Sequence, residues 1–246
     1  MKRRNSTWLH VAMLAAGLAG SGLAFAEDQK PDNEVSYNVA LTSDYRYRGI
    51  SQTRLDPALQ GGADYVNNPT GLYAGTWLST IHWIKDAGGN DNVEWDIYGG
   101  KRGNITEAIT YDVGGLYYLY PSNDLHPNAN TFEVYGQIGF GPAYVKYSHS
   151  LTNLFGAPDS KGSGYFDVGA NIDMGTGLTL NLHVGHQEVR HNGNLSYNDY
   201  KFGVTKDFGV ASLAVAYVVA DTNAYVTPAL KNLGKSGLVV SVSKTF

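Results

Sequence analysis

The chain contains 246 residues, with 18 lysines and arginines against 22 aspartates and glutamates, and it has no cysteine. The acidic balance argues against a nucleic-acid-binding protein, and the lack of cysteine excludes disulfide bonds and the acylated cysteine of a lipoprotein. The 18 tyrosines and 30 glycines favour strands and interfacial aromatic side chains over helices.

The N-terminus has the pattern of a secretory signal peptide. A basic Lys2-Arg3-Arg4 precedes an apolar run over residues 11–20 and a small-x-small site that ends at Ala26. Cleavage there leaves 15 basic and 22 acidic residues, a net charge of −7. We expect residues 1–26 to be the signal peptide, 27–34 a short polar segment and 35–246 a single domain. Beyond residue 26, no apolar run reaches the roughly 18 residues that a transmembrane helix needs.

Residues 35–49 alternate between apolar and polar positions. The odd-numbered positions are mostly apolar or aromatic, and the even-numbered ones are mostly polar. Since successive side chains of a strand point to opposite faces, the pattern predicts a strand with a dry and a wet face. The dry face would include Tyr45 and Tyr47, and the wet face would include Asp44, Arg46 and Arg48.

The same period recurs along the rest of the chain. Counting the last strand, we find twelve candidate strands of roughly 9 to 15 residues, which suits a tilted membrane strand. Residues 178–184 are a clear case, with leucine or valine at every second position. Within 71–84, the pattern does not decide whether Trp77 or Leu78 faces outward.

The connections between the strands alternate in length. Short turns such as Gly141-Pro142 follow the even-numbered strands, and longer polar loops such as 121–130 follow the odd-numbered ones. This asymmetry is typical of an outer-membrane barrel, with turns in the periplasm and loops outside. The sequence therefore predicts an all-β fold, a transmembrane antiparallel up-and-down β-barrel of about 12 strands that covers residues 35–246.

The chain ends on an aromatic residue. Phe246 closes an alternating strand in which Leu238, Val240 and Val242 share one face. Such an end is the usual signal for the outer-membrane assembly machinery, so we expect that machinery to bind the C-terminal strand. Lys244 departs from the pattern, although an amine near the membrane interface can reach water.

Several stretches resemble one known family. They are "NVALTSDYRYRGISQT", "PALQGGADY", "GLYAGTWLS", "TYDVGGLYYLYP", "SYNDYKFGVTKDFG" and "VSVSKTF". In this order, and over nearly the whole chain after residue 26, they are similar to the TorF family of porins. The resemblance implies an outer-membrane β-barrel of proteobacterial type. It brings no established catalytic or ligand-binding residues, because the transport role of that family is itself inferred.

Charged residues on the wet faces would share the lumen. The candidates are Asp44, Arg46, Arg48, Glu94, Asp96, Asp112, Glu133, Asp167, Asp199 and Lys201. Opposed charges across a narrow, water-filled lumen would select ions. Alternatively, arginines and carboxylates pair and hold a small barrel shut. Limited interior room favours pairing, but both hypotheses stay open.

Aromatic residues near strand ends suit the headgroup level of a membrane. Rings with one polar edge favour that level, so an aromatic girdle is the preferred interpretation over a sugar-stacking surface. The candidate girdle residues are Tyr45, Tyr47, Trp95 and Tyr117.

No motif for catalysis is present. None of the seven histidines has a serine two positions later, as the His-x-Ser pair of barrel phospholipases and lipid A deacylases requires. His183 and His186 would face opposite sides of a strand, which disfavours a shared metal. We predict no enzyme, no cofactor and no metal, and keep a hydrolytic site at the outer rim as a weaker hypothesis.

The leading functional hypothesis is passive passage of small polar solutes or ions through the lumen. The alternative is a closed structural or adhesive barrel whose outer loops bind a partner. We expect outer-membrane lipid, the assembly machinery and small polar solutes as partners, and no nucleic acid. The sequence leaves open whether the barrels form homo-oligomers.

Overall fold

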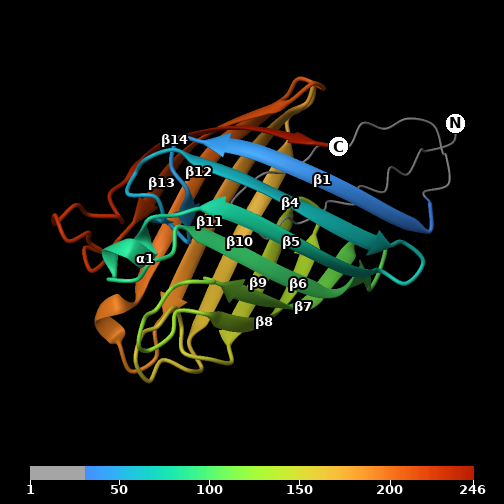
Figure 1. Cartoon of the computed structure of the whole chain (residues 1–246). Helices are drawn as coiled ribbons and strands as arrows, with labels where there is room; N and C mark the ends of the chain where they lie inside the picture. The colour runs from blue at the N-terminus through green and yellow to red at the C-terminus, as the bar shows by residue number, and fades with distance from the viewer. Residues whose placement is uncertain (1–30) are drawn as a thin grey trace, which may run out of the picture.

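The structure, a computed structural model, describes residues 31–246, so the expected signal peptide lies outside the described residues. Twelve strands close into one antiparallel barrel, in which β1 pairs with both β4 and β14 (Figure 1). The barrel strands are β1 (Asn33–Thr42), β4 (Ala58–Asn67), β5 (Leu72–Thr80), β6 (Val93–Asn104), β7 (Ile109–Leu119), β8 (Thr131–Phe140), β9 (Ala143–Ser150), β10 (Gly164–Asp173), β11 (Leu178–Glu188), β12 (Tyr197–Asp207), β13 (Ser212–Ala220) and β14 (Gly237–Thr245). The predicted fold class and strand number are confirmed.

The alternation of side chains along the strands is also confirmed. In β11, Asn181 and Gln187 are buried inside the barrel, whereas Val184 is 51% exposed on its outer surface. In β5, Trp77 faces inward and is 5% exposed, and Leu78 faces outward and is 42% exposed. The open question about these two neighbours is thereby answered.

The connections lie at two different ends of the barrel. Turns of two to four residues join the strands at the short-turn end, and loops of 8 to 16 residues join them at the long-loop end. In Figure 1 the long loops lie at the left, with the short helix α1 (Trp83–Asp86), and the C-terminus lies at the right. A 3₁₀ turn, η1 (Gly193–Leu195), lies in another long loop. Among residues 31–246 no helix is long and apolar enough to cross a membrane.

The first strand is shorter than predicted. We expected it to continue to residue 49, but β1 ends at Thr42, and residues 43–57, here called the inner loop, fold into the barrel. The inner loop contains a hairpin of β2 (Arg46–Tyr47) and β3 (Ile50–Ser51). Its two turn residues, Arg48 and Gly49, both have positive φ, 46° and 80°, as a two-residue type I′ hairpin turn requires.

The hairpin explains why the strand prediction failed there. Alternation through residue 48 is real, but it belongs partly to β2, which runs across the lumen instead of along the wall. Tyr45 is 2% exposed, and Tyr47 packs against Tyr118 and Phe155 inside the barrel. The prediction that these two tyrosines belong to an outer aromatic girdle is therefore wrong.

Candidate functional site in the barrel lumen

The base of the inner loop is held by a buried ion pair. Arg46 donates through Nε to Asp44, and both residues are buried. Asp44 also accepts a hydrogen bond from the Ser51 hydroxyl at 2.6 Å. The guanidinium of Arg46 further donates to the carbonyl oxygens of Gly49 and Leu233, at 2.9 and 3.2 Å. These contacts tie the hairpin to itself and to the long loop that precedes β14.

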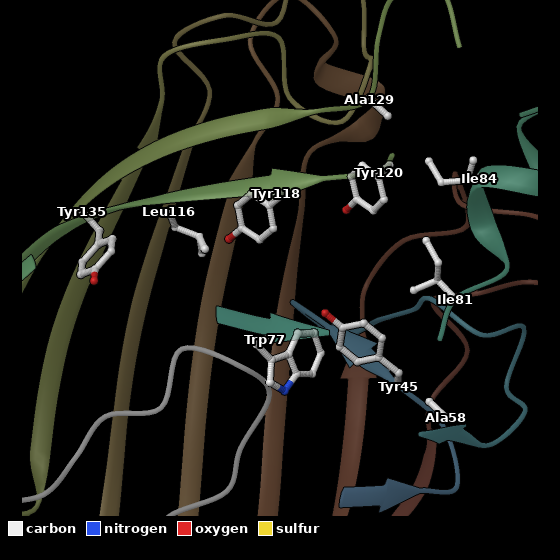
Figure 2. Packing of buried hydrophobic residues seen from close by; sticks show 10 residues of the cluster. All are labelled: Tyr45, Ala58, Trp77, Ile81, Ile84, Leu116, Tyr118, Tyr120, Ala129 and Tyr135. Carbon is white, nitrogen blue, oxygen red and sulfur yellow. The ribbon is translucent and has the colours of Figure 1, made fainter. Parts of the chain in front are cut away.

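Tyr45 joins the inner loop to the wall. Its hydroxyl donates to Glu94 of β6 at 2.5 Å, and Tyr120 donates to the same carboxylate at 2.7 Å. Burial raises the pKa of Tyr45 well above its ordinary value, which keeps this phenol a donor. Its ring meets Trp77 edge to face, with centroids 5.4 Å apart, and Figure 2 shows it beside Trp77 and facing Tyr118 and Tyr120.

We expect the Tyr45→Phe substitution to destabilise the protein by about 1.5 to 3 kcal/mol, because it removes a buried hydrogen bond to a carboxylate. Urea unfolding in detergent measures the change. Tyr65→Phe is the matched control, since Tyr65 donates to Asn33 on the exposed surface, and its loss is expected to cost less than 1 kcal/mol. Equal losses in both variants would contradict a structural role for the Tyr45 hydroxyl.

Arg48 occupies the tip of the hairpin and contacts three strands of the wall, β8, β10 and β11. Its guanidinium donates to both oxygens of Glu133 on β8, at 3.0 and 2.7 Å, and to Gln187 on β11 at 2.7 Å. It also lies over the rings of Tyr47 and Tyr165, at 4.8 and 4.2 Å from their centroids. Arg48 is therefore paired with a carboxylate in this structure, and its role in the lumen stays a prediction.

A cavity of about 750 Å³ lies between the inner loop and the short-turn end. At one end it is lined by inner-loop residues such as Arg48, and at the other by turn residues such as Pro69 and Pro142. Within residues 31–246, the lining contains no residue of the inner loop beyond Gly49. The inner loop thus closes the cavity toward the long-loop end.

An acidic pair on the cavity wall is bridged by a histidine. His183 of β11 contacts Asp167 of β10 through Nδ1 at 2.8 Å and Asp199 of β12 through Nε2 at 2.6 Å. The Tyr165 hydroxyl donates to Asp199 at 2.8 Å. Because carboxylates occupy both ring nitrogens, His183 has no free nitrogen that could act as a general base.

Three cations on the wall lack such partners. The side chains of Lys146 and Lys201 make no hydrogen bond or ion pair with any residue in the described part of the chain. The Lys146 ammonium lies 4.2 Å from the centroid of the Tyr135 ring, and the Arg102 guanidinium lies 5.3 Å from that of Tyr73. Their charges face the cavity.

The predicted lumen residues fall into separate groups. Asp44 pairs with Arg46, Arg48 with Glu133, and Glu94 accepts from two tyrosines. Asp112 accepts a hydrogen bond from Tyr73 at 2.6 Å. Asp96 is buried near the inner loop, and among residues 31–246 its Oδ1 has no hydrogen-bond partner. Ion selection by these residues stays a prediction.

Several residues of the site did not follow from sequence reasoning. Among them are Arg102, Lys146, Tyr165, His183 and Gln187. Strand parity puts all of them on the wet face, so this signal could have identified them as lumen residues. Their mutual contacts depend on the strand register, which parity alone does not determine.

Outside the lumen, the other predicted residues lie as follows. Trp95 faces outward near the long-loop end, is 38% exposed and donates to the Thr76 hydroxyl at 2.6 Å. Tyr117 lies opposite Ile97 on the same outer face. Phe246 is 71% exposed, and its backbone pairs with Tyr37. A girdle role for the first two and an assembly role for Phe246 stay predictions.

Residues 31–246 contain no group of three or more His, Asp or Glu side chains that is placed to bind a metal ion. The expected absence of cofactors stays a prediction.

The comparisons with known proteins agree with the barrel. A family model described as "Bacterial protein of unknown function (Gcw_chp)" matches residues 26–246, while the narrower TorF resemblance stays a prediction. No curated protein matches the chain.

Among solved structures, a "KdgM porin" is similar over 86% of this chain and 97% of its own, with 4% identity and a TM-score of 0.55. A "NanC porin" is similar over 85% of this chain and 98% of its own, with 10% identity and a TM-score of 0.56. At these identities the likeness concerns the fold.

Proposed function

The chain belongs to the bacterial Gcw_chp family, and we propose that it is an outer-membrane barrel that lets small polar solutes or ions pass through its lumen. In this proposal residues 1–26 direct export, the C-terminal strand with Phe246 contacts the assembly machinery, and the long loops face the outside. The TorF resemblance and the porin fold of the two solved structures support the same function.

The outer surface of the barrel supports a membrane location. Large apolar side chains that would be buried in a soluble protein are exposed there, among them Leu41 at 58%, Phe202 at 61% and Leu238 at 69%. Soluble monomers rarely expose apolar patches of more than a few hundred Å². A lipid environment accounts for such a surface.

We expect Val184→Arg to destabilise the barrel in lipid vesicles by about 2 to 4 kcal/mol. Val184 lies in the middle of β11 on the outer surface, so the substitution would put a charge against the lipid. Reversible urea unfolding in vesicles measures this. Val210→Arg is the control, since Val210 lies in a short turn and is 79% exposed, and the cost near the interface falls to about 0 to 1 kcal/mol. Equal costs at both positions would contradict the membrane location.

The observation that carries the passage proposal is the polar cavity inside the closed barrel. It runs from the short-turn end to the inner loop, and charged and hydroxyl-bearing side chains line it. Passage through the whole lumen therefore requires the inner loop to shift. We infer a porin that is closed at rest, and whose inner loop opens it.

Single-channel recording in planar bilayers tests this function. We expect the folded full-length protein to open rarely, and to open more often when contacts of the inner loop are removed. If neither the native protein nor a variant with a released inner loop conducts ions after verified insertion, the passage proposal fails.

A closed structural or adhesive barrel is the second candidate. The observation in its favour is the number of strands that the inner loop engages, since Tyr45 contacts β6 and Arg48 contacts β8, β10 and β11. Such a network suits a permanently closed lumen. Failure of every inner-loop variant to conduct would select this candidate.

A further inference from the structure

The carboxylates that line the cavity all have partners within the protein. Asp44 and Glu133 pair with arginines, and Asp112 accepts from Tyr73. Asp167 and Asp199 share His183. A carboxylate with such partners has little capacity left to attract a solute cation.

Apart from the paired arginines of the inner loop, three cations that line the same cavity have no carboxylate partner in the described part of the chain. The side chains of Lys146, Lys201 and Arg102 form no hydrogen bond or ion pair with residues 31–246, although they lie partly buried beside the cavity. An ammonium or guanidinium with unused donors in a confined space favours an anionic ligand. The uncommitted charge of the cavity is therefore positive.

The two lysines flank the histidine bridge on the wall. Lys146 of β9 lies opposite Asp167 of β10, and Lys201 of β12 lies opposite His183 of β11. Three strand spacings of roughly 4.8 Å separate β9 from β12 along the wall. A small molecule with an anionic group at each end could therefore contact one lysine with each group.

The surrounding polar groups define the rest of the site. Tyr135 and Tyr144 line the cavity near Lys146, and their hydroxyls can donate to or accept from a polar solute. Arg102 lies two positions before the end of β6, at the short-turn mouth of the cavity. Positive charge at a mouth raises the local concentration of anions.

We propose that this cavity binds small organic dicarboxylates, with Lys146 and Lys201 as their principal ligands. A dicarboxylate site deepens the proposed function, because it names the solute class, and its transport role rests on that function. The site itself requires only that the cavity is open to solvent at the short-turn end.

Isothermal titration of the full-length protein in detergent micelles tests the site, with succinate, inorganic phosphate and uncharged glucose as probes. We expect succinate to bind, phosphate to bind more weakly and glucose not to bind. The Lys146→Gln and Lys201→Gln substitutions together should weaken succinate binding at least tenfold. Lys235→Gln is the control, because Lys235 is exposed in the loop before β14, and it should leave binding unchanged.

The failures can be told apart. Absence of succinate binding, equal binding of glucose, tighter binding of phosphate, or unchanged affinity in the double lysine variant would each overturn the dicarboxylate site. Heat-modifiable gel mobility and circular dichroism show whether the double variant folds, and the single Lys201→Gln variant replaces it if it does not. A protein that binds succinate but never conducts would retain the site and lose only the passage function.

Discussion

Oxidation of a Gly49→Cys/Ala220→Cys variant is expected to abolish channel opening, and a reducing agent is expected to restore it. Gly49 lies at the tip of the inner-loop hairpin, and Ala220 is the last residue of β13 on the barrel wall. A disulfide between them would hold the inner loop in the closed position. Because the native chain has no cysteine, the engineered pair has no competing thiol.

The two positions lie close together. A Cβ atom built on Gly49 would lie 3.2 Å from Cβ of Ala220, shorter than the roughly 3.5 to 4.5 Å that disulfides adopt, and 2.6 Å from Cβ of Asp199. The hairpin tip must therefore move slightly away from the wall before the bond can form. The positive φ of Gly49, 80°, adds a strain of about 1 kcal/mol for any side chain there.

The two single cysteine variants are the matched controls. Gly49→Cys carries the same backbone strain and the same contact with Asp199 as the double variant, but it cannot form the intramolecular bond. We expect its channel activity not to respond to oxidant or reductant. If the oxidised double variant conducts as well as the reduced one, with the bond verified by mass spectrometry, the inner loop is not the gate.

Much of the barrel could be predicted from sequence because its physics is local. Alternation in β11, with Asn181 and Gln187 on one face and Val184 on the other, follows from the geometry of a single strand. The positions of turns and long loops follow from the same local patterns. The closed twelve-stranded fold needed no information about which residues meet across the lumen.

The inner loop could not be predicted in the same way. Residues 43–48 alternate as a wall strand does, and the signal for a turn was the single glycine at position 49, after Arg48. An Asn-Gly or Asp-Gly pair is the strong hairpin signal. Here the first turn position is Arg48, which adopts a positive φ of 46° although arginine has no particular preference for it. Contacts with Glu133 and Gln187, which are distant in sequence, stabilise this conformation.

For the charged site too, the local pattern could be predicted from sequence and the long-range contacts could not. Parity put Asp167, Asp199 and Lys201 on the wet face, and all three line the cavity. The bridge through His183 arises from the register of three neighbouring strands, and a shift of one residue would turn the side chains to the other face. Strand parity therefore predicts which charged side chains face the lumen. Which of them pair with each other depends on the register, and the structure is needed to tell the paired carboxylates from the unpaired lysines.

The second large effect is expected from Arg48→Ala, which should raise the open probability of the channel at least tenfold. The substitution removes every side-chain contact between the hairpin tip and Glu133, Gln187 and Tyr165. It also leaves the Glu133 carboxylate, 2% exposed, without its cation. Breaking one side of a buried ion pair costs about 3 to 5 kcal/mol, and release of the inner loop relieves that cost by letting water reach Glu133.

Arg54→Ala is the matched control in the same inner loop. Arg54 pairs with Asp86 at 2.6 Å, but its side chain is 38% exposed at the rim of the barrel. This pair joins the inner loop to α1 and not to the barrel wall, so its loss leaves the contacts of Arg48 with Glu133 and Gln187 in place. We therefore expect little change in open probability, and an equal increase in both variants would mean that any loss of charge from the inner loop opens the channel.

A double variant separates the contact from the buried charge. In Arg48→Ala/Glu133→Ala no carboxylate is left without a cation, so its free energy of unfolding should exceed that of Arg48→Ala alone. The inner loop would still lack its tip contacts, and the open probability should stay high. If the double variant is as closed as the native protein, the unpaired charge of Glu133, and not the loss of the Arg48 contacts, is what displaces the inner loop.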